Sequence, residues 1–264
     1  MKIALAQISS GTSVQQNIAK ISDFTRRAAA QNAELVVFPE ASMSAFGTDL
    51  LAAAEQAEHW QKTLANLAEE HRITIVVGEF EAAGKRVRNV AAVYNPAAAR
   101  ASYTKIHLYD AFGFSESDTV APGDTPLVLE IAGTKVGFAL CYDVRFPKLF
   151  AELSRAGAQV IVVPTSWAPG EGKEEQWKIL IRARALDSNC FVIAVDQANP
   201  TVAGTDADPN SPTGIGFSAA VDPFGHTLIE CGEGEELRII ELDLSLAEKV
   251  AQSIPVLKNA KLGY

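Results

Sequence analysis

Three side chains that could carry out nucleophilic catalysis stand directly after apolar, strand-like runs of the sequence. Glu40 follows the run 35–39, Cys141 follows the run 136–140, and Lys105 ends a third, shorter run. Ligands of α/β sheets bind beyond the carboxyl ends of strands, so we expect these side chains to meet at one site. A thiol, a carboxylate and an ammonium group together provide a nucleophile, a proton acceptor and a cation that stabilises an oxyanion.

Each of these residues, taken alone, has an ordinary structural explanation. A cysteine at the end of an apolar strand is usually a packed small side chain, and a lone glutamate or lysine there is usually solvated. Their joint occurrence indicates a thiol site. The residues 142–147 lead from Cys141 into a helical pattern. We therefore expect the thiol to face the N-terminus of a helix, with its pKa lowered from the free value of about 8.5.

Spacing excludes several other chemistries. A phosphatase loop requires an arginine where Pro147 stands, and none of the four histidines has a context that marks it as the base of a papain-like pair. A carboxylate is therefore left as the base. The run 214–219 matches a dinucleotide-binding glycine pattern, but it leads into a strand-like segment instead of a helix. No metal-binding motif is present, so we expect neither a metal nor a cofactor.

Short β-branched runs alternate with segments of helical period, as in strands joined by crossover helices. The ranges 2–6 and 33–39 align with 135–139 and 158–164, at offsets that differ because the loops differ in length. Two such halves can bury their bare sheet faces on each other. We therefore predict a single α/β domain over residues 1–264, a four-layer α-β-β-α sandwich with an internal pseudo-two-fold repeat.

The boundaries expected for its elements follow from the same patterns. Strands are predicted over 2–9, 34–38, 73–80, 88–95, 101–106, 127–131, 134–141, 159–163, 190–196, 215–221, 227–231 and 237–242. Helices are predicted over 13–31, 52–71, 146–156 and 172–188. The stretch 199–213 is rich in turn-forming residues and is expected to be a long loop.

Composition and charge restrict the class of protein. Of the 264 residues, 48% are hydrophobic and 21% are charged, which is an ordinary globular composition. The net charge of −9 disfavours nucleic acid and anionic membranes as partners. The cysteines Cys141, Cys190 and Cys231 form no C-x-x-C pair, so neither a disulfide framework nor a zinc site is expected. We find no signal peptide or membrane-spanning run, and expect a cytoplasmic protein.

Longer motifs surround the three residues, namely F-P-E at 38–40, Y-T-K-I-H-L-Y-D-A-F at 103–112 with E-S at 116–117, C-Y-D-V-R-F-P at 141–147, D-P-F-G at 222–225 and I-P-V-L-K-N at 254–259. Together they resemble the nitrilase, or carbon–nitrogen hydrolase, superfamily. The resemblance spans nearly the whole chain and points to the Nit branch, first to its bacterial deaminated-glutathione amidases and then to the related ω-amidases. It implies an α-β-β-α sandwich with a Glu-Lys-Cys triad.

The resemblance implies catalytic roles for Glu40, Lys105 and Cys141, and Glu116 matches a second glutamate that many members place beside the triad. In this chemistry Glu40 takes the thiol proton, and Cys141 attacks an amide carbonyl and forms a thioester. Lys105 and the backbone N–H of Tyr142 are suited to hold the oxyanion. The implied reactants are a small linear amide, which we expect to be acidic, and water, with no cofactor.

The resemblance also implies a homodimer or a higher homo-oligomer. The tail 253–264 is apolar at Ile254, Val256 and Leu257 and shows no helical period. Because such a segment needs a surface to cover it, we expect the tail to lie at the subunit interface.

Residues around the second-half strand ends are candidates for substrate binding. Ser166, Trp167 and the loop from there to Gln176 are expected to line the acyl pocket, although plain packing would explain Trp167 equally well. Arg145 could bind a substrate carboxylate or could pair with Asp143.

Two departures from the Nit pattern leave the identity of the substrate open. Lys148 stands where Nit-branch enzymes commonly have glutamate, and Gln176 stands where they often have histidine. An N-carbamoyl amidase or a nitrilase could use the same triad. A catalytically silent binding module is the alternative from a different class of protein.

Overall fold

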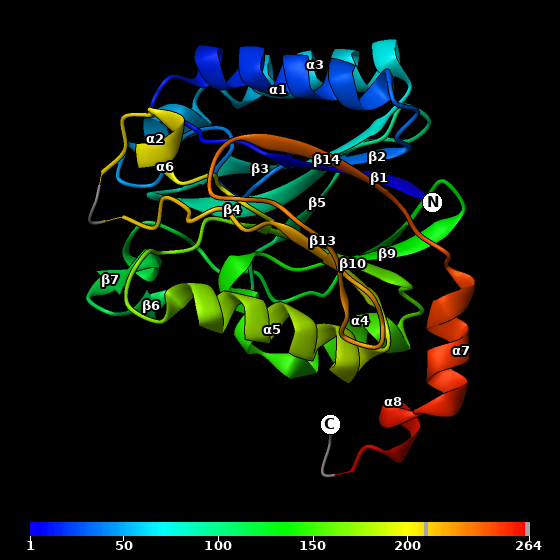
Figure 1. Ribbon diagram of the computed structural model, residues 1–264. Coiled ribbons are helices and arrows are strands. Elements are labelled where there is room, and N and C mark those ends of the chain that lie inside the picture. Colours follow the sequence, from blue (N-terminus) through cyan, green and yellow to red (C-terminus); the bar gives the residue numbers. More distant parts are fainter. Residues whose placement is uncertain (209–210, 262–264) are drawn as a thin grey trace.

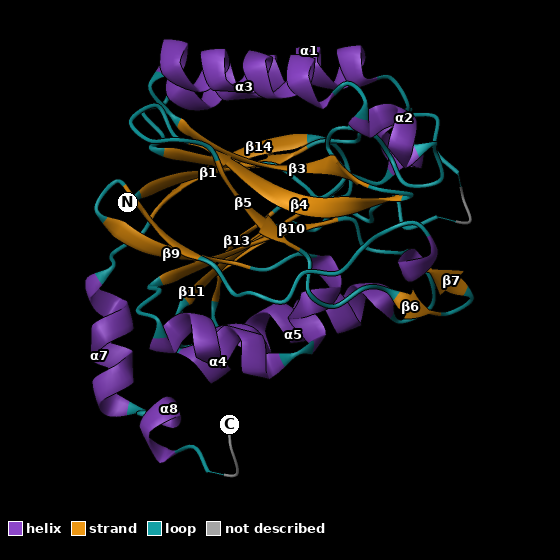
Figure 2. Ribbon diagram, turned by 180° about the vertical axis from the view of Figure 1, so that it is seen from behind, coloured by secondary structure: helices purple, strands orange, loops and turns teal. Residues whose placement is uncertain are grey.

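Two six-stranded sheets lie face to face between layers of helices in the computed structural model, which describes residues 1–208 and 211–261 (Figures 1 and 2). The layers follow the predicted α-β-β-α order. The first sheet contains, in spatial order, β14 (Glu236–Glu241), β1 (Lys2–Gln7), β2 (Leu35–Val37), β3 (Thr74–Ala83), β4 (Arg86–Tyr94) and β5 (Ala101–Thr104). The second contains β13 (Thr227–Glu230), β12 (Ala219–Val221), β11 (Phe191–Asp196), β10 (Val160–Thr165), β9 (Thr134–Phe138) and β8 (Val128–Ile131).

Pairs of helices cover the outer faces of the two sheets. Helices α1 (Val14–Ala29) and α3 (Ala57–His71) lie on the first sheet, and α4 (Pro147–Arg155) and α5 (Lys173–Ser188) lie on the second (Figure 2). In β1, Ile3 and Leu5 pack into the core between the sheets, whereas Ala4 and Ala6 belong to the core under α1 and α3. This period of two is what a strand buried on both faces requires.

Equivalent strand pairings in the two sheets confirm the predicted internal repeat. Ile3 of β1 pairs in parallel with Leu35 of β2, and Val136 of β9 pairs in parallel with Val160 of β10. These are the positions that the sequence alignment matched. In the first sheet the parallel strand β3 follows β2, and the antiparallel strands β4 and β5 come next. In the second sheet the parallel strand β11 follows β10, and the antiparallel strands β12 and β13 come next. Each sheet also has one antiparallel strand on its opposite edge. For the first sheet that edge strand is the C-terminal β14, beside β1.

Four of the predicted boundaries are wrong by three residues or more or miss a break. The strand predicted over 73–80 extends to Ala83 as β3. The helix predicted over 52–71 is two helices, α2 (Leu50–Ala54) and α3, with a turn between them. The strand predicted over 134–141 ends at Phe138, because the chain turns there into the segment that carries Cys141. The strand predicted over 215–221 is reduced to β12, since the Ile215 N–H donates to the Asp196 carboxylate at 2.9 Å instead of to a neighbouring strand.

The C-terminal region contains two helices without a counterpart in the prediction, α7 (Ser245–Ser253) and α8 (Val256–Asn259). They extend away from the sandwich (Figure 1). The tail shows no helical period in sequence because α8 is a single turn, which begins after Pro255 with its fixed φ. Ile254 is 47% exposed. Residues 262–264 of the predicted interface tail lie outside the described residues.

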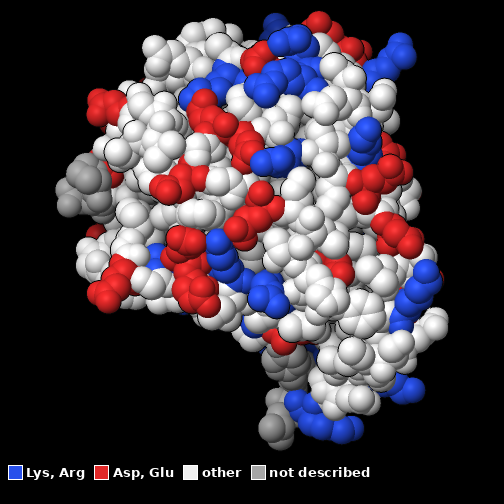
Figure 3. Space-filling model, in the orientation of Figure 1, with Lys and Arg blue, Asp and Glu red and all other residues white. Residues whose placement is uncertain are grey.

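The surface carries both signs of charge. On the face shown in Figure 3, basic and acidic side chains are interspersed over both sheets' covering helices and loops. None of the helices in residues 1–208 and 211–261 is both long and apolar enough to span a bilayer.

Candidate active site

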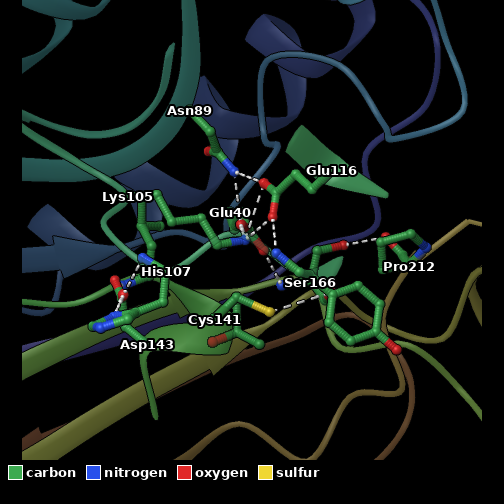
Figure 4. A network of polar contacts seen from close by, with 12 residues as sticks. Glu40, Asn89, Lys105, His107, Glu116, Cys141, Asp143, Ser166 and Pro212 are labelled. Carbon is green, nitrogen blue, oxygen red and sulfur yellow. Dashed lines mark hydrogen bonds and ion pairs between the residues drawn. The ribbon is translucent and has the colours of Figure 1, made fainter. Parts of the chain in front are cut away.

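The four residues that the resemblance assigns to catalysis lie together beyond the strand ends of both sheets (Figure 4). Glu40 lies shortly after β2, and Lys105 directly follows β5. Glu116 begins the 3₁₀ helix η1 (Glu116–Asp118), and Cys141 begins the 3₁₀ helix η2 (Cys141–Arg145). All four are buried, with exposures between 0% and 6%. Sequence segments far apart in the chain therefore converge on one buried cluster.

Close packing of two neighbouring strands sets the position of Glu40. Gly78 of β3 lies against its backbone, and a Cβ atom there would come within 2.6 Å of Glu40 Cα. A residue larger than glycine at this point would therefore displace Glu40. The Glu40 carbonyl oxygen accepts a hydrogen bond of 2.8 Å from Gln197 Nε2, which follows β11. The backbone at Glu40 is thus held by contacts to both sheets.

Lys105 is the centre of the charged network. Its Nζ lies 2.8 Å from Glu40 Oε1 and 2.8 Å from Glu116 Oε2, and Asn89 Nδ2 donates to both carboxylates (Figure 4). Burial favours the neutral amine, but the charges of Glu116 and Glu40 outweigh it, so the pKa of Lys105 lies well above its ordinary value. The ammonium group therefore stays charged at neutral pH.

The Glu40 carboxylate has a raised pKa and well-defined partners. Burial raises its pKa, the charge of Lys105 opposes this, and the charge of Glu116 adds to it. Its Oε2 atom accepts a hydrogen bond of 2.9 Å from the Ser166 N–H. Glu40 is thus a stronger base than a solvated glutamate and is held in one orientation.

The Cys141 thiol lies beside this network at the start of η2. Its Sγ donates to the Ser166 carbonyl oxygen at 3.6 Å, and its backbone is in the left-handed region with φ of 41°. A non-glycine residue at this φ is strained, a feature often associated with functional sites.

The expectation of a lowered thiol pKa is wrong. Burial raises the pKa of Cys141 well above its ordinary value, the charge of Glu40 adds to this, and Lys105 only partly opposes it. A 3₁₀ helix of five residues supplies too small a dipole to compensate for complete desolvation. The resting thiol is therefore protonated.

Asp143 fixes the turn that carries Cys141. Its carboxylate accepts hydrogen bonds from Tyr103 Oη at 2.7 Å, from the His107 N–H at 3.0 Å and from the Leu140 N–H at 2.9 Å. These contacts join η2 to the segment after β5. The predicted alternative of an Arg145–Asp143 pair is therefore wrong, because Asp143 is occupied by other groups.

The cluster opens into a narrow pocket. Of the predicted substrate-binding residues, Arg145, Ser166 and Trp167 all line it, as does Tyr142. Ala168 and Lys173 also line it and belong to the loop that was expected to do so. The further lining residues, which the sequence did not indicate, are Phe46, Tyr109 and Pro212. Pro212 comes from the predicted long loop, where its carbonyl oxygen accepts a hydrogen bond of 2.7 Å from Ser166 Oγ.

Arg145 and the two residues that depart from the Nit pattern have distinct positions. The guanidinium of Arg145 donates to Gln176 Oε1 at 2.8 Å and lies 5.0 Å from the centre of the Trp167 ring. Gln176 thus orients the cavity arginine without neutralising it. Lys148 is exposed and is not among the lining residues of the cavity.

Comparison with known proteins shows the family. A family model described as "Carbon-nitrogen hydrolase" matches residues 2–252. The chain belongs to the carbon–nitrogen hydrolase family. This hydrolase is 43% identical to Hydrolase Rv0480c of Mycobacterium tuberculosis, over 98% of the chain and 95% of that protein. It is 31% identical to the deaminated glutathione amidase of Escherichia coli O157:H7, over 99% of the chain and 97% of that protein.

A solved structure supports the same assignment. The hydrolase is 29% identical to omega-amidase NIT3 of Saccharomyces cerevisiae, over 99% of the chain and 93% of that protein. The crystal structure of Saccharomyces cerevisiae Nit3, a member of branch 10 of the nitrilase superfamily, aligns with a TM-score of 0.80 at 27% identity, over 97% of the chain and 94% of that structure. The hydrolase is thus an enzyme of the class that cleaves C–N bonds other than peptide bonds in linear amides.

Several residues of the hydrolase site were missed by sequence reasoning. Asn89 and Asp143 lie inside a strand and a turn, where an amide or a carboxylate has no local signature. Lys173 and Tyr109 reach the cavity from α5 and from the segment before the hairpin of β6 (Asp110–Ala111) and β7 (Phe114–Ser115). Lys173 lies in the stretch up to Gln176 that was expected to line the pocket, but the sequence gave no sign that its charged group and Tyr109 would meet there.

Proposed function

We propose that this hydrolase cleaves a small linear amide bearing a carboxylate, with activity like that of a deaminated-glutathione amidase or an ω-amidase, through a thioester on Cys141. The supporting observation is the buried contact of Lys105 with Glu40 and Glu116, at a cavity that Cys141 also lines. A buried ion cluster is weak evidence for stability, and perturbed titrating groups beside a cavity are typical of catalytic sites.

Attack on the amide requires a base because the resting thiol is protonated. Glu40 accepts the Sγ proton as Cys141 forms a bond to the carbonyl carbon, and the carbonyl π electrons move onto oxygen. The raised pKa of Glu40 favours this transfer. The product of the step is a tetrahedral intermediate that carries an oxyanion.

Lys105 and the Tyr142 N–H bind that oxyanion. The first intrahelical bond of η2 runs from the Asp143 N–H to the Leu140 carbonyl oxygen at 2.9 Å, so the Tyr142 N–H precedes the bonded part of the helix. Its N–H is therefore available to a substrate oxygen. Removing one donor of such a pair typically lowers kcat by about 100- to 1000-fold.

The remaining steps use the same carboxylate. Glu40 gives its proton to the leaving nitrogen as the C–N bond breaks, and ammonia or an amine departs from the thioester. Water then gives a proton to Glu40 as it adds to the thioester carbon. Collapse of the second intermediate breaks the C–S bond, returns the proton to sulfur and releases a carboxylic acid. Glu116, which accepts two hydrogen bonds from Lys105, orients that ammonium throughout.

Arg145 supports the choice of a carboxylate-bearing substrate. Its partner Gln176 is neutral, so its charge is open to a bidentate carboxylate within the cavity. Ser166 and Trp167 supply the neighbouring wall. An N-carbamoyl compound or a nitrile would meet the same groups, so both belong in the substrate panel.

The test is release of ammonia or amine from that panel. Cys141→Ala should abolish it and leave the circular dichroism spectrum unchanged, since only a small side chain is lost. Cys190→Ala is the matched control, because Cys190 is also buried but does not line the cavity. Residual hydrolysis by the Cys141 variant would overturn the proposal. Inertness of the unmodified protein toward the whole panel would instead favour a binding module.

We further infer a homodimer and a cytoplasmic location. The apolar tail with its exposed Ile254 supports an interface at residues 253–261. The free cysteines Cys141, Cys190 and Cys231 fit a reducing compartment.

A further inference from the structure

Asp196 is a buried carboxylate beside the active site that the proposed mechanism does not use. It is the last residue of β11 and pairs in register with Thr165, the last residue of β10. Its Oδ1 accepts a hydrogen bond of 2.7 Å from the Trp167 N–H, and its Oδ2 accepts one of 2.9 Å from the Ile215 N–H. Over residues 1–208 and 211–261, the structure contains no salt bridge of Asp196 with a basic side chain. A carboxylate buried without a cation costs free energy of folding, so its position requires an explanation.

A single peptide unit separates Asp196 from the Cys141 thiol. The Trp167 N–H belongs to the same peptide unit as the Ser166 carbonyl group, to which Cys141 Sγ donates at 3.6 Å (Figure 4). In a trans peptide the carbonyl and N–H groups point in opposite directions. The thiol and the carboxylate therefore lie at the two ends of a chain of two hydrogen bonds. In such a chain, an anion bound to the N–H makes the carbonyl oxygen a stronger acceptor.

The backbone of Ser166 contacts the base as well as the thiol. The Ser166 N–H donates to Glu40 Oε2 at 2.9 Å, whereas the S–H group of Cys141 is directed to the Ser166 carbonyl oxygen. The orientation of this short segment thus decides where the thiol proton lies before a substrate binds. Asp196 holds the peptide bond that directly follows Ser166.

The same carboxylate joins two segments of the cavity wall. Through Ile215 it binds the end of the loop that contains Pro212, and Ser166 Oγ donates to the Pro212 carbonyl oxygen at 2.7 Å. The Gly214 N–H donates to the Trp167 carbonyl oxygen at 3.1 Å. The peptide unit between Ser166 and Trp167 is therefore held on both sides and has one orientation.

The two N–H donors favour the charged form of Asp196. Burial raises the pKa of Asp196 well above its ordinary value, and the N–H groups of Ile215, Trp167 and Gln197 oppose this. Each carboxylate oxygen accepts an N–H group, whereas a neutral carboxyl group would have to donate from one of them. Burial is also the main cause that raises the pKa of Cys141, the charge of Glu40 adds to it, and the charge of Asp196 adds further.

We propose that Asp196 is a positioning residue whose carboxylate, acting through the peptide unit between Ser166 and Trp167, holds the resting Cys141 thiol in its protonated form until Glu40 takes the proton with an amide in place. The inference rests on the proposed function, in which Cys141 is the nucleophile, and adds how that site is controlled before the substrate binds. A thiolate reacts with oxidants and other electrophiles, whereas a thiol does so slowly. The arrangement thus limits the reactivity of Cys141 to bound substrate.

Alkylation of Cys141 by iodoacetamide tests the inference without an amide. Below the thiol pKa, the alkylation rate is proportional to the fraction of thiolate. Asp196→Asn removes the charge and keeps the size of the side chain. A charge on the far side of one peptide unit, at an effective dielectric constant of about 20, changes a pKa by about one unit. The variant should therefore raise the rate of Cys141 alkylation by about tenfold at each pH below the thiol pKa, and by less above it.

Two controls separate the loss of charge from the loss of packing. Ser218→Ala removes the hydroxyl that accepts the Asp196 N–H at 2.9 Å, so it deletes a buried hydrogen bond to the same residue but no charge. It should change the alkylation rate by less than about twofold. Cys190 is buried and does not line the cavity, so peptide mass spectrometry of the same samples should find it unmodified.

The outcomes separate this inference from the proposed function. An unchanged or slower alkylation of Cys141 in Asp196→Asn would overturn the role of Asp196, and so would an equal increase in Ser218→Ala. If Cys190 is alkylated together with Cys141, the Asn variant does not keep its fold, and Asp196→Ser, a smaller uncharged side chain, supplies the deciding rate. Failure of the proposed function is read separately, from absent release of ammonia or amine by the unmodified enzyme across the amide panel.

Discussion

Asn89 offers a sharp test of how the site tunes its base. Its Nδ2 donates to Glu40 Oε1 at 2.8 Å and to Glu116 Oε1 at 3.0 Å. Among the described residues its Oδ1 has no hydrogen-bond partner, so the two carboxylates alone determine the orientation of the amide. Both donations stabilise charged carboxylates, and the one to Glu40 lowers the pKa of that group against the effect of burial. Asn89 is therefore a positioning residue with a measurable electrostatic effect.

The perturbation is Asn89→Leu, which removes both donors and leaves a side chain of similar size. A hydrogen bond to a charged group contributes about 1.5 kcal/mol or more, and a pKa unit corresponds to about 1.4 kcal/mol, so the pKa of Glu40 should rise by about one unit. Glu40 acts as a base only when it is ionised. The acid limb of kcat/KM, which falls as the pH drops through this pKa, should therefore move up by about one pH unit.

The assay is the pH profile of kcat/KM for the best amide of the panel. Below the acid limb Asn89→Leu should lose about tenfold, and well above it the loss should be far smaller. Asn17→Leu is the matched control, because Asn17 is another buried asparagine whose Nδ2 contacts two acceptors, here the backbone carbonyl oxygens of Gly11 and Met43. A uniform loss at every pH, or an acid limb displaced downward, would refute the electrostatic role of Asn89.

Two further predictions concern the substrate and the assembly. Arg145→Ala should lower kcat/KM by about 10- to 150-fold for an amide with an acyl-side carboxylate and much less for a neutral amide of equal length, whereas equal losses in steady-state assays would show that Arg145 only supports the turn. Deleting residues 253–264 should shift the protein toward monomer or aggregate in light scattering, and an unchanged dimer would place the interface elsewhere.

The main features of the fold could be predicted because they depend on local pattern. Alternating apolar residues and loop offsets were enough to align β1 with β9 and β2 with β10, and the pairings Ile3 with Leu35 and Val136 with Val160 confirm that alignment. The position of β14 beside β1 depends on contacts between the two ends of the chain, which no local pattern contains. The two-residue strands β6 and β7 are too short to produce a period.

Sequence could predict those residues of the site that come directly after a strand. Glu40 and Lys105 follow β2 and β5, and these ends meet as the rule for α/β sheets requires. Lys173 is one of 23 lysines and arginines, and its place depends on how the start of α5 packs against the hairpin. The thiol pKa was predicted in the wrong direction because sequence shows a following helix but does not show complete burial.

The internal repeat explains why the chemistry occurs at one end of the molecule and not at two. The repeat makes Ile3 equivalent to Val136 and Leu35 equivalent to Val160. Cys141 follows Val136 by the same number of positions as Ile8 follows Ile3. Glu40 likewise follows Leu35 by the same number of positions as Thr165 follows Val160. The equivalent of the proposed nucleophile is thus an isoleucine and the equivalent of the proposed base is a threonine, both with 0% exposure.

Ile8 and Thr165 have structural roles. The Ile8 carbonyl oxygen accepts the Ala198 N–H at 2.8 Å, and the Thr165 hydroxyl donates to the Val163 carbonyl oxygen at 3.1 Å. Neither position has a free acid, base or nucleophile. A thiol introduced at Ile8 would have no carboxylate at the position equivalent to Glu40, and a threonine hydroxyl could not take its proton at neutral pH. In the proposed mechanism one half of the repeat supplies the base and the other supplies the nucleophile, so catalysis would require both halves even though they share one pattern.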